Sequence, residues 1–423
     1  MYEYYARTRR NKLLNLGEYM KFIEGGVCSA KGFKANGIHC GIRKNKSKLD
    51  FALIVSDTLC STASVYTQNL VKGAPILVTQ KNSANGYAQA IICNSGNANT
   101  CNANGVEIAT AMCDLVEKHL GIKSTDVIVA STGVIGQPLS ITPMENGMAD
   151  LVKGLDYNKS KEANFAIMTT DTIEKSCAIE FVVGGKTCRI GGIAKGSGMI
   201  HPNMATMLCF ITTDVNIAPN MLDKALHKAI SDSFNMLSVD GDTSTNDMVS
   251  VIANGLAGNE KIESENQDYI EFENALTAVC QSIVSMIAKD GEGATKLLVC
   301  KVSGAKDTKN AKIVAKSVIT SSLFKAAMFG ADANWGRVLC AIGYSGADVD
   351  VNKVDVEFES TKGKILVCQG GSGVDFDEDI AKEILLQDEI NIIIELNDGT
   401  GVATAWGCDL TYDYVKINGD YRT

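Results

Sequence analysis

Short apolar runs alternate with amphipathic segments along most of the chain, and this alternation predicts a mixed α/β protein. Residues 49–55, 88–93 and 126–130 have the length and the β-branched content of strands. Residues 106–120 carry apolar side chains at three- and four-residue intervals and end before Gly121, as a helix commonly does. Strands and helices therefore follow one another in the first third of the chain.

The same alternation continues to the C-terminus. We expect a strand at 206–212, a helix that starts at Pro219, a strand at 248–253 and a long amphipathic helix at 269–288. Beyond it, short predicted strands alternate with helical segments such as 317–329; these strands are residues 297–302, 354–358, 365–367 and 392–396. Gly and Asn gather at 94–99, which we interpret as a turn.

Composition narrows the class of protein. The chain has 423 residues, 45% of them hydrophobic, which favours two or three packed domains. The formal net charge of −9 argues against a nucleic-acid-binding surface. No stretch reaches the 18 consecutive apolar residues of a membrane helix, so no membrane association is expected. Residues 1–19 are predicted to be a poorly ordered extension, and Met1 and Met20 both qualify as the start.

Cysteine and histidine usage excludes several kinds of site. The fourteen Cys are scattered singly without a C-x-x-C pair, which makes zinc and thioredoxin-like redox sites poor explanations. Single Cys in apolar runs behave as small core residues, and a reducing cytoplasm is the simplest setting for them. The four His lack metal-ligand spacing, so we expect neither a metal ion nor a His base.

The segment 195–208 carries the strongest chemical signal. Its glycine-rich arm leads through Pro202 to Ala205 and Thr206, and an apolar, strand-like run follows. This arrangement suits a chain that cuts itself before Thr206, because the new N-terminal threonine could use its own α-amine as general base. A phosphate-binding loop is excluded, since Lys195 precedes its glycine instead of following it. A simple turn before a strand remains the alternative from spacing alone.

Further motifs accompany this segment in a fixed order. They are residues 32–33, 94–99, 131–136, 169–172, 239–247, 290–296, 330–337 and 418–423. Together with 195–208 they resemble the ornithine acetyltransferase (glutamate N-acetyltransferase) family of arginine biosynthesis. The resemblance covers about residue 32 to the last residue, and residues 1–19 have no counterpart in it.

The resemblance implies acetyl transfer through a covalent intermediate. Thr206 would attack the acetyl group of N-acetylornithine, and glutamate would then take the acetyl group from Thr206 to give N-acetylglutamate. The side chain of Thr132 and the backbone N–H of Gly133 would form the oxyanion hole, a kind of donor typically worth on the order of 3 kcal/mol in the transition state. In isolation Thr132-Gly133 would read as a turn.

The resemblance also implies which residues bind the substrate. Besides Thr206 these are Thr172, Lys195, Glu292, Asn418 and Thr423. A cation at Lys195 suits the substrate α-carboxylate, and Glu292 could face the side-chain amine of ornithine. By contrast, Asp240, Asp242 and Asp247 lack the spacing of a calcium-binding loop, and we interpret them as structural turn residues.

The family fold is a layered helix-sheet-sheet-helix sandwich, similar to that of self-cleaving hydrolases with an N-terminal nucleophile. We expect a main α/β domain at 20–296, which contains the cleavage site, and a smaller α/β domain at 297–423. The two fragments should stay associated as a heterotetramer with two of each, in the cytoplasm, without a cofactor. Whether acetyl-CoA is a second donor, which would make the enzyme bifunctional, stays open. The alternatives are a related self-cleaving aminopeptidase or amidase that passes the acyl group to water, and a non-catalytic binding protein.

Overall fold

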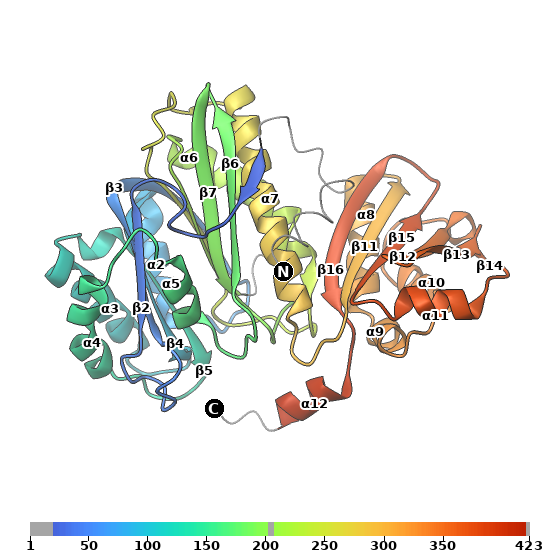
Figure 1. Ribbon diagram of the computed structural model, residues 1–423, viewed down its shortest axis with the longest axis horizontal. Helices are drawn as coiled ribbons and strands as arrows, with labels where there is room; N and C mark the ends of the chain where they lie inside the picture. Colours follow the sequence, from blue (N-terminus) through green and yellow to red (C-terminus); the bar gives the residue numbers. More distant parts are fainter. Residues whose placement is uncertain (1–19, 202–206, 420–423) are drawn as a thin grey trace.

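The computed structural model describes residues 20–201 and 207–419, and within them it contains two β-sheets (Figure 1). The nine-stranded sheet has the order β1-β6-β7-β8-β10-β3-β4-β5, and β2 pairs with β3 in addition. Its strands are β1 (Lys21–Ile23), β2 (Phe33–Ile38), β3 (Phe51–Tyr66), β4 (Tyr87–Asn97), β5 (Val127–Val134), β6 (Lys175–Val183), β7 (Lys186–Lys195), β8 (Leu208–Thr213) and β10 (Met248–Ala253).

The seven-stranded sheet has the order β14-β13-β12-β15-β11-β16-β9. Its strands are β9 (Leu237–Ser238), β11 (Leu297–Ala305), β12 (Asp355–Ser360), β13 (Gly363–Gln369), β14 (Ser372–Gly373), β15 (Glu389–Glu395) and β16 (Gly401–Cys408). β11 begins at the residue where we expect the C-terminal domain to start, and β9 joins the sheet from an earlier part of the chain.

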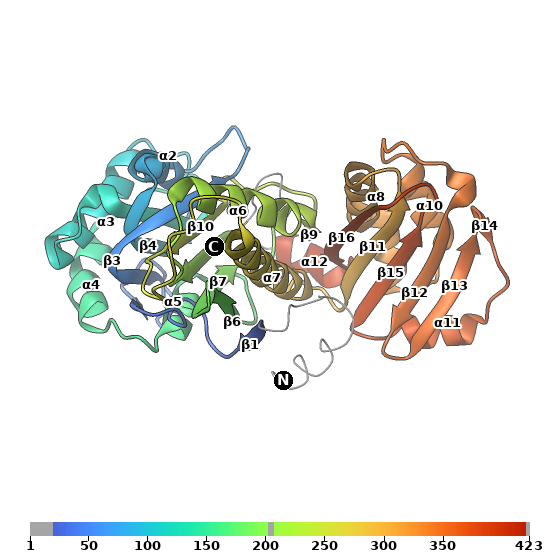
Figure 2. The ribbon, with the colours of Figure 1, turned by 90° about the horizontal axis from the view of Figure 1, so that it is seen from above.

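Helices cover both sheets. They are α2 (Ala74–Asn82), α3 (Gly105–Leu120), α4 (Thr142–Lys153), α5 (Ser160–Ile167), α6 (Pro219–Ser231), α7 (Gln267–Lys289), α8 (Thr308–Thr320), α9 (Ser322–Phe329), α10 (Trp335–Gly343), α11 (Glu378–Leu385) and α12 (Tyr412–Gly419). α7 packs against strands of both sheets and lies between them in both views (Figures 1 and 2). None of the helices in the described ranges is long and apolar enough to cross a membrane.

The nine-stranded sheet folds over on itself at β3, which is long enough to pair with β2 and β4 at its start and with β10 at its end. Because strand side chains alternate between faces, Phe51 and Leu53 pack in a core under α3 and α4. Ala52 and Ile54 point the other way, into a second core that they share with Leu208 and Phe210 of β8. Two halves of one sheet therefore face each other across this second core.

The opposite face of β8 completes the layers. Cys209 and Ile211 pack in the third core, under α6 and α7. The order across the molecule is α3 and α4, one half of the sheet, the other half, then α6 and α7. The predicted helix-sheet-sheet-helix fold is confirmed.

Most of the predicted elements are present, but several differ in extent. The predicted strand 49–55 is the start of β3, which continues to Tyr66. The segment 317–329 is wrong as one helix: it spans the end of α8 and all of α9, because the side chain of Ser321 accepts a hydrogen bond from the backbone N–H of Phe324 and caps a new helix. The predicted turn at 94–99 is wrong for residues 94–97, since β4 continues to Asn97. The predicted strand at 206–212 corresponds to β8, and its first residue lies outside the described part of the chain.

Candidate active site

Thr132 and Gly133 lie at the end of β5, beside the end of β4. The two strands run parallel, with Thr132 opposite Ser95 and Gly133 opposite Gly96. Gly133 has a φ of +132°, and a Cβ atom there would lie 2.3 Å from the carbonyl carbon of Gly96. Only glycine allows this close approach, which fixes the backbone that follows Thr132.

The side chain of Asn246 holds this strand end from the other side. Its Nδ2 donates to the carbonyl oxygens of Ala98 at 2.6 Å and Ser131 at 3.0 Å. Its Oδ1 accepts hydrogen bonds from the hydroxyls of Thr100 at 2.5 Å and Thr245 at 2.7 Å. All hydrogen-bonding atoms of this buried amide are used, so the residue before Thr132 is rigidly placed.

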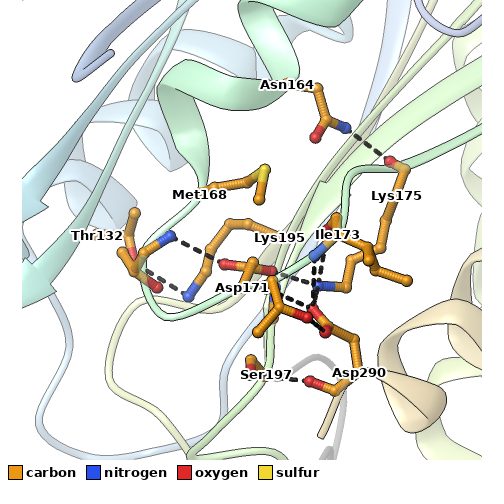
Figure 3. A network of polar contacts seen from close by, with 12 residues as sticks. Thr132, Asn164, Met168, Asp171, Ile173, Lys175, Lys195, Ser197 and Asp290 are labelled. Carbon is orange, nitrogen blue, oxygen red and sulfur yellow. Dashed lines mark hydrogen bonds and ion pairs between the residues drawn. The ribbon is translucent and has the colours of Figure 1, made fainter. Parts of the chain in front are cut away.

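Lys195 ends β7 and reaches across to Thr132. Its Nζ donates to the Thr132 hydroxyl at 3.4 Å (Figure 3), at the long end of the hydrogen-bond range. In the sheet Lys195 pairs with Leu208, the first residue of β8. Two residues that are 63 positions apart and that we predicted for one site are thus in contact, next to the strand that follows Thr206 in the chain.

Behind Lys195 lies a buried ion triad of Lys175, Asp171 and Asp290 (Figure 3). Lys175 Nζ is 2.6 Å from Asp171 Oδ1 and also contacts Asp290 Oδ2, and the Lys175 side chain has no exposed area. Burial opposes ionisation of Asp171, but the charges of Lys175 and Lys195 outweigh it and lower its pKa to about 2. Asp171 is therefore a carboxylate at any pH near neutrality.

The ion triad is bonded to segments that carry predicted substrate residues. Asp290 accepts hydrogen bonds from the backbone N–H of Thr172 at 3.0 Å and from the Thr172 hydroxyl. Asp171 Oδ1 also accepts from the backbone N–H of Gly196 at 2.7 Å, directly after Lys195. The triad thus connects the residue after β7 with the end of α7.

Glu292 follows α7 and is buried. Asn418 of α12 donates from Nδ2 to Glu292 Oε2 at 2.9 Å, so these two predicted residues are also in contact. Gly198 packs against them, since a Cβ atom there would lie 2.3 Å from the Glu292 carboxyl carbon. Gly293 has a φ of +69° and lies so close to α12 that a Cβ atom would come within 2.5 Å of the backbone nitrogen of Tyr414.

A cavity of about 530 Å³ opens beside these residues. It is lined by Thr172, Lys289, Asp290, Gly291, Gly293, Ala294, Asp413, Lys416 and Ile417. The cavity thus touches the backbone on both sides of Glu292, whereas Thr132 and Lys195 do not line it. The predicted site residues form two groups, one at Thr132 and one at Glu292, and the ion triad lies between them.

The acidic loop at 239–247 divides into two kinds of residue. Asp240 is a turn residue as predicted, because its carboxylate accepts hydrogen bonds from the backbone N–H groups of Met199, Ile200 and Asp242. Asp247 differs: it is buried, and its Oδ2 has no hydrogen-bond partner among the described residues. Burial raises the pKa of its carboxyl well above the usual range, although Lys195 opposes the shift.

Among the described residues, we asked whether a histidine could act as a base and whether side chains gather to hold a metal ion. His201 Nδ1 lies 3.1 Å from the Ser238 hydroxyl, and burial lowers the pKa of His201 to about 4, so the ring is neutral near pH 7. No group of three or more His, Cys, Asp or Glu side chains among residues 20–201 and 207–419 is placed to hold a metal ion.

Three predicted residues, Ala205, Thr206 and Thr423, lie outside the described residues. The chain is described again from Met207, whose carbonyl oxygen accepts a hydrogen bond from the backbone N–H of Met248 at 2.8 Å.

Residues 34–423 match the family model of the ArgJ family. The chain belongs to the ArgJ family. It is 52% identical over 392 residues to the arginine biosynthesis bifunctional protein ArgJ 1 of Clostridium acetobutylicum, covering 92% of this chain and 96% of that one. It is 48% identical to the ArgJ protein of Caldanaerobacter subterraneus, covering 96% of this chain and all of the other. A crystal structure of ArgJ from Bacillus halodurans has 46% identity and a TM-score of 0.48, and covers 50% of this chain and 98% of that chain. The family recognised from the motifs is confirmed.

The ion triad was not predicted from the sequence. A signal was present in the sequence of β6, where every second residue from Cys177 to Val183 is apolar. Counting back by twos from Val183 places Lys175 on the inner face, where a lysine needs carboxylate partners. Asp290 could not be identified as a partner, because it is 115 residues away in the chain.

Proposed function

We propose that this ArgJ-family enzyme transfers the acetyl group of N-acetylornithine to glutamate through an ester on Thr206. The observation that carries the proposal is the contact of Lys195 with Thr132 at the end of β5, directly beside the strand that follows Thr206. The related proteins named as arginine biosynthesis bifunctional proteins support the same pathway.

The first half-reaction forms the ester. The Thr206 hydroxyl oxygen attacks the acetyl carbonyl carbon while its proton passes to the Thr206 α-amine. The Thr132 hydroxyl and the Gly133 N–H stabilise the oxyanion of the tetrahedral intermediate, on a backbone fixed by the contact with Gly96. The C–N bond then breaks, the proton goes to the leaving nitrogen, and ornithine departs.

The second half-reaction reverses these steps with a different amine. The amino group of glutamate attacks the ester carbonyl carbon and passes its proton to the Thr206 α-amine. When the C–O bond breaks, the Thr206 oxygen takes this proton and N-acetylglutamate leaves. The acetyl group is conserved throughout, so no cofactor is needed.

The substrate residues divide by charge. The Lys195 ammonium is suited to a substrate carboxylate, and the buried Glu292 carboxylate to the side-chain amine of ornithine. Thr172, Asn418 and Thr423 would add hydrogen bonds. Glutamate carries a carboxylate where ornithine carries an amine, so it must lie differently at Glu292 or contact that residue through a bridging water.

Self-cleavage between Ala205 and Thr206 belongs to the same proposal. β8, which follows the cut, lies in the sheet between β7 from before the cut and β10 from after it. β10 in turn pairs with β3 from before the cut. These strand pairs would hold the two fragments together, and we further propose that two of each form a heterotetramer in the cytoplasm.

The test is an assay of the purified protein for N-acetylglutamate, with glutamate as acceptor and either N-acetylornithine or acetyl-CoA as donor in separate tubes. Formation of N-acetylglutamate from N-acetylornithine is the expected result. The tube with acetyl-CoA decides whether the enzyme is bifunctional. Release of free acetate from N-acetylornithine without N-acetylglutamate would instead identify an amidase that passes the acyl group to water.

A further inference from the structure

We propose that Lys175 is a positioning residue for substrate binding, which acts without touching the substrate by holding the ion triad together. The triad connects the segments that carry Lys195, Thr172 and Glu292, so its integrity decides whether these three can bind one substrate molecule. The inference rests on the proposed substrate roles of those three residues.

Lys175 cannot itself touch a substrate. It is the first residue of β6, its side chain has no exposed area, and its Nζ is occupied by Asp171, Asp290 and the carbonyl oxygen of Ile173 at 3.4 Å. A fully buried ammonium is costly unless it is paired, and the loss of one partner leaves the remaining charges uncompensated. Any effect of Lys175 on binding must therefore pass through the two carboxylates (Figure 3).

Asp171 links Lys175 to the segment that carries Lys195, on one side of the proposed substrate site. Its Oδ1 is shared between Lys175 Nζ at 2.6 Å and the backbone N–H of Gly196 at 2.7 Å. Its Oδ2 accepts from the backbone N–H of Thr169 at 2.9 Å. Lys195 is the second cation that interacts with this carboxylate. With Lys175 in place, the Lys195 ammonium is free to lie against Thr132 and a substrate carboxylate.

Asp290 links Lys175 to the segment that carries Glu292, on the other side of the proposed substrate site. Its carboxylate binds the backbone and the hydroxyl of Thr172. Its carbonyl oxygen accepts from the Ser197 hydroxyl at 2.9 Å, and the carbonyl oxygen of Ser197 accepts from the backbone N–H of Glu292 at 3.0 Å. The segment after Lys195 and the segment with Glu292 are thus joined through Asp290.

Without Lys175, two buried carboxylates would face each other, and Lys195 would be the remaining cation near Asp171. We expect repulsion to separate the two segments and to draw Lys195 toward Asp171, away from Thr132. The contributions of Lys195 and of Glu292 to substrate affinity should both fall, while the oxyanion hole at Thr132 and Gly133 keeps its own backbone supports.

The experiment compares Lys175→Met with the double variant Lys175→Met/Asp290→Asn. Ornithine binding is measured by calorimetry, KM and kcat for N-acetylornithine are measured by assay, and the melting temperature by thermal unfolding. The double variant restores the balance of buried charge without restoring the bridge, so it separates stability from positioning.

We expect Lys175→Met to melt at a lower temperature and to raise Kd and KM about tenfold or more, with a smaller change in kcat. The double variant should regain much of the melting temperature and keep the raised Kd and KM. Lys325→Met is the control, because Lys325 is also buried but donates to the carbonyl of Val239; it should lower the melting temperature without changing Kd for ornithine.

Wild-type Kd and KM in a folded Lys175→Met protein, or their recovery in the double variant together with the melting temperature, would overturn the proposal. If Lys175→Met does not fold, the double variant decides alone. A wild-type protein that binds ornithine but transfers no acetyl group would contradict the proposed function, and the Kd comparison would still test the role of Lys175.

Discussion

At the scale of single residues, the Thr132 hydroxyl is the group whose loss should separate rate from binding. It lies 3.4 Å from Lys195 Nζ on a backbone held by Asn246 and by the approach to Gly96. We expect Thr132→Ala to lower kcat by about 10²- to 10³-fold with a much smaller change in KM, because the oxyanion exists only around the transition state.

Steady-state kinetics with N-acetylornithine and glutamate measures both parameters. Thr132→Ser, which keeps a hydroxyl on the same backbone, is the matched control and should retain most of the activity. An increase in KM alone in Thr132→Ala would make Thr132 a substrate contact and would remove it from the oxyanion hole.

Asp247 leads to a prediction about pH. Its pKa is raised by burial, so the folded protein favours the neutral carboxyl, whereas in the unfolded chain this group ionises above about pH 4. The stability that it contributes is present below the unfolded pKa and is lost as the pH rises through the folded pKa. Asp247→Asn cannot ionise, so in a pH series that starts at about pH 4 we expect the melting temperature of the variant to rise progressively relative to that of the wild type as the pH increases.

Thermal unfolding of both proteins across that range checks this prediction. A constant difference between the two melting temperatures would show that Asp247 has an ordinary pKa in the folded protein.

The sequence could not predict this behaviour, because three similar aspartates share one loop and only burial distinguishes Asp247 from Asp240. Thr132, Lys195, Glu292 and Asn418 could be named as candidate site residues from the sequence because each lies in a motif of the family, and their roles stay predictions.

At the scale of elements, the contact between Gly293 and α12 places Asn418 beside Glu292. A methyl group at 293 would meet the backbone nitrogen of Tyr414 at 2.5 Å, and the φ of +69° adds strain. We expect Gly293→Ala to displace α12 and to raise KM for N-acetylornithine, with a stability loss of about 1–2 kcal/mol from the backbone alone.

Gly346→Ala is the control for this prediction, because Gly346 has a similar φ of +79° but no atom within 4 Å of the added Cβ. It should lose comparable stability and keep its KM. Equal KM values in the two variants would show that the position of α12 does not matter for binding.

Elements with a clear apolar period were predictable, and the exceptions have local causes. The bounds of β10 agree with the prediction because all of its residues are buried. The start of α6 agrees because the helix begins with a proline. The break between α8 and α9 was missed, since it depends on the capping side chain of Ser321. The hairpin of β6 and β7 was not predicted, because Lys175 and the glycines at 191 and 192 interrupt its apolar alternation.

At the scale of the whole molecule, the layered fold follows from one long strand. β3 pairs with β2 and β4 near its start and with β10 at its end. The two parts of the sheet therefore face each other, with β5 and β7 on opposite sides of one core. Periodicity alone cannot predict such long-range pairing, and the layer order was predictable only through the family motifs. The same pairing joins the parts of the chain before and after Thr206.

The most direct test of the account is intact mass spectrometry of the active protein, before and after incubation with N-acetylornithine in the absence of glutamate. We expect two fragments split between Ala205 and Thr206, and after incubation the fragment that begins at Thr206 should be heavier by one acetyl group. Addition of glutamate should remove that group, and Thr206→Ala should remain one inactive chain. A single uncut chain with full activity would contradict the account.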